Sequence, residues 1–167
     1  MFRPLAVVAV VLAIALLAYY GWEFLSRPRL KSPEELAQVA LNADTAATRE
    51  LAAVRLSQFD EPAREQLLSV FGASKQPEVR AACIRGLAQQ WSYGSMPLLL
   101  DALDDEALSV REQAGQAVQR MLRINYEFRA GDPPEKRQAV VKRLRIRWDK
   151  FRNSEVNIEF IRQHQRD

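Results

Sequence analysis

The chain has 167 residues, of which 48% are hydrophobic and 27% are charged, and its formal net charge is +3. This length fits one domain, and the composition is that of a folded protein. The single cysteine, Cys83, excludes an internal disulfide, and its apolar neighbours predict a small buried side chain. Because good helix formers dominate and glycine is scarce, we expect an all-α fold.

The charges are distributed unevenly along the chain. Residues 1–31 carry +3, residues 32–135 carry −6, residues 136–152 carry +7 and residues 153–167 carry −1. An acidic body is therefore followed by one strongly basic segment, which makes that segment a candidate binding surface.

The chain begins with an uncharged apolar run from Leu5 to Trp22. As a helix this run would extend about 27 Å, close to the roughly 30 Å hydrocarbon core of a bilayer. Aromatic residues that favour the headgroup level stand at its end: Tyr19, Tyr20 and Trp22. We predict a transmembrane signal-anchor over residues 1–26, in contact with the lipid bilayer through residues 4–25, and a basic linker over residues 27–31.

The sequence leaves two properties of this segment open. Small residues at Ala13–Ala15 and Ala18 also fit a cleaved secretory signal, whose removal would give a secreted protein. Arg3 is the one basic residue before the run, whereas three basic residues follow it: Arg27, Arg29 and Lys31. This excess favours a single-pass protein of a bacterial inner membrane with its main domain in the cytoplasm.

The next segment, "SPEELAQVAL" from Ser32, has the pattern of a helix start. Ser32 is the expected N-cap, Glu35 completes a capping box, and Pro33 takes the first helical position. We expect this helix to close the N-terminal end of the domain.

Three similar segments follow at a spacing of 31 residues: "TRELAAVRL" from Thr48, "VRAACIRGL" from Val79 and "VREQAGQAV" from Val110. Their first, fifth and ninth positions are mostly apolar or small and would form one stripe on a helix. An arginine takes the second position each time: Arg49, Arg80 and Arg111.

Second helices are expected between these copies, over "DEPAREQLLSVF" from Asp60 and "SMPLLLDAL" from Ser95. Each unit is then a helical hairpin, which cannot bury its apolar face alone and needs neighbouring units to form a core. We predict a short right-handed α-solenoid of about three hairpins over residues 32–152.

Two stretches carry a family resemblance: "KQPEVRAACIRGL" from Lys75 and "LDALDDEALSVREQAGQAV" from Leu100. They resemble HEAT repeats of the short bacterial, phycobilisome-lyase-like kind, closely over residues 40–122 and more loosely over residues 123–152. The resemblance implies that Arg49, Arg80 and Arg111 bond to acidic or backbone groups of adjacent turns. It indicates a fold and leaves the function open.

After a longer loop, "RINYEFRAGDPP", a last helix is expected over "EKRQAVVKRLRIRWDKF". Its apolar stripe is surrounded by basic residues that are candidates for binding an acidic protein partner or anionic headgroups: Arg137, Lys142, Arg143, Arg145, Arg147, Lys150 and Arg152. A solvated outer face is the alternative, and nucleic acid is disfavoured because the acidic body would repel phosphates. The tail over residues 153–167 fits a strand-like arm or a frayed helix.

The sequence predicts no catalytic, cofactor-binding or metal-ligating residues. It has one histidine, His164, no HExxH or CxxC motif and no glycine-rich phosphate loop. The acids of "DALDDE" from Asp101 are expected to be solvated caps between helices. We therefore expect a membrane-tethered scaffold or accessory subunit of a membrane protein assembly, and not an enzyme. The alternative is a HEAT-fold lyase or glycosylase with a groove lined by Asp101, Trp91 or Tyr93.

Overall fold

A computed structural model describes residues 32–59 and 63–163, and every regular element within them is helical. The α-helices are α2 (Pro33–Asn42), α3 (Ala46–Leu56), α4 (Arg64–Ala73), α5 (Pro77–Gln89), α6 (Met96–Asp101), α7 (Leu108–Leu122), α8 (Pro134–Arg152) and α9 (Glu155–Gln163). Two short 3-10 turns, η2 (Tyr93–Ser95) and η3 (Ala102–Asp104), flank α6. The predicted all-α class is confirmed for these residues.

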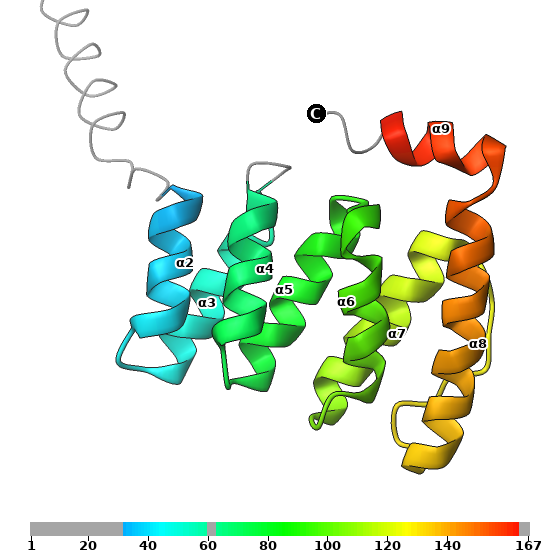
Figure 1. The fold of residues 1–167 in the computed structure, drawn as a ribbon. Helices are drawn as coiled ribbons and strands as arrows, with labels where there is room; N and C mark the ends of the chain where they lie inside the picture. Colours follow the sequence, from blue (N-terminus) through cyan, green and yellow to red (C-terminus); the bar gives the residue numbers. More distant parts are fainter. Residues whose placement is uncertain (1–31, 60–62, 164–167) are drawn as a thin grey trace, which may run out of the picture. The chain divides into compact units, whose positions relative to one another are not determined.

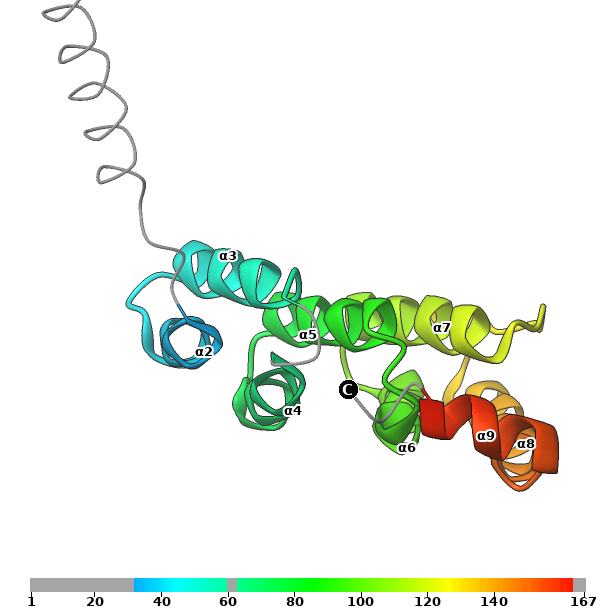
Figure 2. The ribbon, with the colours of Figure 1, turned by 90° about the horizontal axis from the view of Figure 1, so that it is seen from above.

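The helices form two layers. Helices α3, α5 and α7 lie side by side in one layer, and α2, α4, α6 and α8 lie in the other (Figures 1 and 2). Successive helices pair as hairpins α2–α3, α4–α5 and α6–α7, and α8 begins a fourth hairpin. The predicted stack of about three hairpins is therefore present, but each repeat copy is the second helix of its hairpin and not the first. Helix α2, which was expected only to close the N-terminal end, is the first helix of the first hairpin.

Several expectations fall outside the described residues: the anchor over 1–26 with Tyr19, Tyr20 and Trp22, the linker over 27–31, the helix start at Asp60, and His164. Among the helices within residues 32–59 and 63–163, none has the length and apolar character needed to cross a bilayer.

The apolar stripe of the three copies forms a buried seam along α3, α5 and α7. Eight of its nine positions are buried: Ala52, Leu56, Val79, Cys83, Leu87, Val110, Ala114 and Val118. The ninth, Thr48, is exposed, since the part of the chain that the structure describes has no hairpin before the first one. Cys83 is fully buried as predicted, and this burial raises the pKa of its thiol to about 12.

Helix α5 joins the two halves of the core. Its residues Val79, Cys83 and Leu87 pack with α2, α3 and α4, whereas Ile84 and Ala88 pack with α6, α7 and α8. Phe71 and Leu98 contact both clusters. The apolar core is therefore continuous through the stack.

The helix ends agree only in part with the sequence. The Ser32 hydroxyl accepts a hydrogen bond from the Glu35 amide at 3.2 Å, as the capping box predicts. The helix expected from Ser95 is present, with Ser95 as the N-cap residue of α6, but the buried Ser95 hydroxyl bonds to that of Ser92 at 2.7 Å and does not cap the helix. The end of that stretch, from Ala102, belongs to the 3-10 turn η3.

The tail forms helix α9, so the strand-like alternative is wrong for residues 155–163. Ile158 and Ile161 stand three residues apart, and Ile161 packs against the apolar core. Arg162 also pairs with Glu159 at 3.0 Å, an i, i+3 contact within a helix. The three-residue spacing of Ile158 and Ile161 fits a helix, and it outweighs the alternation of Val156, Ile158 and Phe160 with polar residues.

A pair of glycine variants tests the packing of α5 on the first two hairpins. A Cβ added at Gly86 would lie 2.8 Å from Ser57 Cα and 2.9 Å from Leu67 Cδ1, whereas one added at Gly72 meets nothing within 4 Å. We expect Gly86→Ala to lower the free energy of unfolding by about 1–3 kcal/mol through overpacking. Gly72→Ala should raise it by about 0.5–1 kcal/mol through helix propensity. Urea denaturation measures both, and shifts of the same sign would contradict the packing described.

Candidate functional site

The repeat arginines form a row of clamps along one edge of the stack. Each donates a hydrogen bond to the carbonyl six residues before it: Arg49 Nη1 to Ala43 O at 2.6 Å, Arg80 Nη1 to Ser74 O at 3.3 Å, and Arg111 Nη1 to Asp105 O at 2.8 Å. Each acceptor lies in the turn that leads into the arginine's own helix. The arginine therefore fixes the turn of its own hairpin.

The same three guanidinium groups also reach the following turn. Arg49 Nε donates to Gln76 Oε1 at 2.7 Å, Arg80 Nη2 to Asp105 Oδ1 at 2.8 Å, and Arg111 Nε to Ala130 O at 2.7 Å. The side chains of Arg80 and Asp105 are only 10% and 13% exposed. The hydrogen bond that Arg80 donates to Asp105 raises the pKa of Arg80 further. Arg80 is also the most enclosed arginine of the row, since it is buried whereas Arg49 and Arg111 are half-buried.

Three of the predicted binding residues of α8 form ion pairs with acidic residues of the chain itself. Arg137 Nη2 binds Asp104 Oδ1 at 2.6 Å and its Nη1 donates to Asp132 O at 2.7 Å, so it serves as a further clamp with an 11% exposed side chain. Arg145 pairs with Asp101, and Arg152 pairs with Asp149 at 2.9 Å. Asp104 of η3 therefore already pairs with Arg137, and binding of an outside partner by Arg137 stays a prediction.

The acids of "DALDDE" from Asp101 also differ from the prediction, which made them solvated caps. Asp105 Oδ1 accepts a hydrogen bond from the Ala107 amide at 2.9 Å, which closes the turn before α7 but does not cap the helix, because Ala107 is itself the N-cap residue. However, Asp101, Asp104 and Asp105 each also bind an arginine of a neighbouring helix. Within the described residues, no group of three or more acidic, histidine or cysteine side chains is placed to hold a metal ion.

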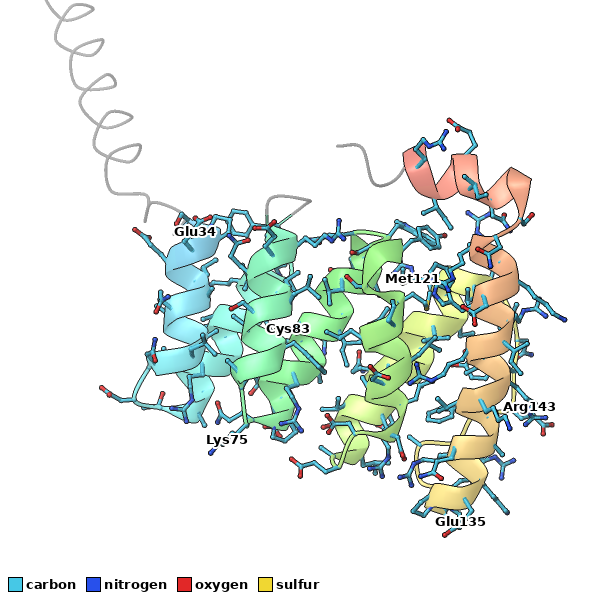
Figure 3. The ribbon with its side chains drawn as sticks, viewed as in Figure 1. Glu34, Lys75, Cys83, Met121, Glu135 and Arg143 are labelled. Carbon is cyan, nitrogen blue, oxygen red and sulfur yellow. The ribbon has the colours of Figure 1, made fainter. Side chains whose placement is uncertain are left out.

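The remaining basic residues of α8 lie exposed on its outer side. Ion pairs within the described part of the chain do not include Lys136, Lys142, Arg143, Arg147 or Lys150. Lys142, Arg143 and Lys150 stand three or four residues from Ile146, a large apolar side chain that is 51% exposed. We call this set, with Ile146, the basic face; Figure 3 shows Arg143 on the side of α8 away from α6.

The segment over residues 124–130, which we call the strap, covers α7. Its side chains alternate: Ile124, Tyr126 and Phe128 pack against the apolar core, whereas the residues between them are exposed. The Tyr126 hydroxyl donates to Gly115 O at 2.9 Å, and burial raises its pKa. In a complete fourth hairpin, α8 would be followed by a second helix that lies beside α7. The strap covers α7 in its place.

The sequence predicts a longer loop for the residues that form the strap. The alternation in "INYEF" was the available signal, but it spans too few residues to separate a packed strap from a loop.

A groove runs between the strap and α8. One hollow of about 530 Å³ is lined by Ile124, Asn125, Tyr126, Glu127, Val140, Arg143, Leu144 and Arg147. A second of about 410 Å³ shares Glu127, Val140 and Arg143 with it and extends to Arg129, Asp132, Lys136 and Ala139. This strap–α8 groove brings two predicted binding residues, Arg143 and Arg147, together with strap residues that sequence reasoning missed.

Of the residues named for a catalytic groove, Trp91 and Tyr93 come together, stacking with their ring centroids 6.4 Å apart. Tyr93 is buried, stacks on both Trp148 and Phe151, and its hydroxyl donates to Met121 O at 3.2 Å. Arg120 and Arg123 lie over the ring of Trp91 at 5.3 and 5.7 Å from its centroid. Asp101 lines a different hollow from Tyr93.

Comparison with protein families identifies the architecture. Residues 33–119, more than half of the chain, match the family model for HEAT repeats. The chain therefore belongs to the HEAT-repeat family. Searches of curated proteins and of solved structures returned no match. The family match ends before the strap and α8, so the basic face and the groove lie beyond the matched repeats.

The clamp of Arg80 can be tested against an exposed pair. We expect Arg80→Ala to lower the free energy of unfolding by about 3 kcal/mol, because it leaves the enclosed Asp105 carboxylate without its cation. The matched change Arg152→Ala removes an exposed i, i+3 pair and should cost less than about 0.5 kcal/mol. Equal losses in urea denaturation would show that the clamp contributes no more than a surface ion pair.

The Arg137–Asp104 pair predicts a pH dependence. The hydrogen bond from Arg137 lowers the pKa of Asp104, so the pair stabilises the fold above the ordinary aspartate pKa of about 3.9. This stabilisation is lost as pH falls through the lowered value. The difference in unfolding free energy between the wild type and Asp104→Asn should therefore be constant near neutrality and shrink in acid. In an Arg137→Gln background that pH-dependent difference should be much smaller, because only Gln138 and Arg111 then lower the pKa of Asp104. An undiminished difference would assign it to another group.

Proposed function

We propose that this chain is a non-catalytic, membrane-tethered protein-binding scaffold or accessory subunit of a membrane protein assembly. Its HEAT repeats would form a firm support, and the basic face of α8 would dock an acidic partner protein. The observation that carries this proposal is the set of exposed basic side chains that remain on α8 after its other arginines have paired with acids.

The architecture supports a binding role. HEAT repeats stack into extended surfaces on which side chains from successive hairpins lie side by side. The arginine clamps hold neighbouring turns together, so a partner would meet a preformed surface. Ile146 adds an exposed apolar centre with a charged rim, the arrangement found at protein interfaces.

The proposed membrane tether is inferred from the sequence of the first 31 residues. The uncharged run from Leu5 to Trp22 has the length and composition of a membrane span, and basic residues follow it. We place the repeats at the cytoplasmic side of a bacterial inner membrane, where the anchor would raise the local concentration of a membrane-bound partner. The phycobilisome-lyase-like subtype and the right-handed sense of the stack belong to the same proposal.

A comparison of two charge-reversal variants tests the scaffold. We expect the tagged chain to be recovered with membranes and, after detergent solubilisation, to retain a stoichiometric protein partner. Lys142→Glu with Lys150→Glu should remove that partner, because both side chains lie on the basic face. The matched control is Arg55→Glu with Lys75→Glu, which reverses two exposed charges on other hairpins and should retain it.

Recovery of the chain alone in the soluble fraction would contradict both the tether and the assembly. Equal partner retention by the two double variants would place the docking surface elsewhere on the repeats. Circular dichroism confirms that both variants keep their helical content.

A further inference from the structure

The strap–α8 groove has two unlike walls and an apolar floor. Lys136, Arg143 and Arg147 of α8 form a basic wall, and the strap with its following turn contributes Glu127, Arg129 and Asp132. The floor consists of Val140, which is half-buried, and Leu144, which is buried. An occupant must therefore combine negative charge on one side with an apolar group between the walls.

The strap itself favours an extended occupant. Its side chains alternate between half-buried and exposed, as they do in an extended chain, although the Phe128 amide donates to Tyr126 O at 3.0 Å. Within the described residues the amides of Asn125, Tyr126 and Glu127 donate no backbone–backbone hydrogen bond. An exposed extended segment of this kind can pair with a second extended chain, which gains affinity from main-chain hydrogen bonds and specificity from alternate side chains.

We propose that the strap–α8 groove binds an extended acidic segment of the partner protein, with one aliphatic side chain of that segment over Val140 and Leu144. Its carboxylates would contact Arg143 and Arg147, which pair with no acid of the described chain. This inference rests on the proposed scaffold function and specifies the chemistry of the partner.

The charges of the groove favour a peptide over a flat anionic surface or a nucleic acid. Glu127 and Asp132 line the same groove as the arginines and would repel a continuous array of phosphates. A peptide can place its carboxylates along α8 and keep them away from the strap. A concave groove with an apolar floor also offers nothing specific to a planar layer of headgroups.

The test uses the full chain in zwitterionic nanodiscs and a fluorescein-labelled peptide of sequence Glu-Asp-Leu-Glu-Asp. We expect saturable binding by fluorescence anisotropy. Replacing the leucine of the probe by glycine should weaken binding by about tenfold or more, as expected for a lost buried aliphatic side chain. Replacing its acids by their amides should also weaken binding, and added salt should reduce the affinity of the original probe.

Variants of the chain locate the binding site. Arg143→Glu with Arg147→Glu should weaken peptide binding by about tenfold or more, because two attractions become repulsions. Arg55→Glu with Lys75→Glu makes the same change in net charge away from the groove and should leave binding unchanged. Val140→Phe fills the floor without altering charge and should weaken binding of the leucine probe more than that of the glycine probe.

Other results would overturn the inference. Unchanged peptide binding by the Arg143 and Arg147 variant would remove the groove as its site. Binding of vesicles rich in phosphatidylserine with no binding of the peptide would assign the basic wall to a membrane surface, and chain-to-chain association lost in that variant would assign it to a second copy. In each of these cases the proposed scaffold function is tested separately, by recovery of the protein partner from membranes. It is the absence of that partner from preparations of the wild-type chain that overturns the proposed function.

Discussion

The stack depends on one interaction, the bridging of two turns by a single guanidinium group. A turn that leads into a helix contains carbonyls that the helix itself does not satisfy, and arginine presents five donors in a fixed planar arrangement. Arg80 uses this geometry to bind Ser74 O and the Asp105 carboxylate together. Because the arginine recurs every 31 residues, each hairpin is fixed to the next in the same register.

The two ends of the stack differ because the repeating contacts stop there. At the first hairpin the stripe position of Thr48 is exposed, and the Thr48 hydroxyl pairs with that of Thr45 at 2.7 Å. At the other end the strap covers α7, and Arg137 and Arg145 draw α8 onto the acids beside α6. Within residues 32–59 and 63–163 no further hairpin contacts the outer side of α8, which is why its remaining charges are exposed.

The sequence predicted those features that depend on local spacing. The 31-residue period and the i, i+4, i+8 stripe located the seam, and Ser32 located the first helix start. The sequence did not predict the pairing of Arg137 and Arg145, because their acids lie 33 and 44 residues away and only the packing of α8 on α6 brings them together. The groove was missed for the same reason, since one wall is the strap. In α9, too few residues were available to separate a helical from an alternating pattern.

Native-state hydrogen exchange measures the coupling between hairpins most directly, because it reports which helices open together. The account predicts that the amides of α5 and α7 exchange through one shared opening in the wild type, and through separate openings once Arg80→Ala has removed the bridge between their turns. Separate openings of α5 and α7 in the wild type would contradict it, as would an exchange pattern that the substitution leaves unchanged.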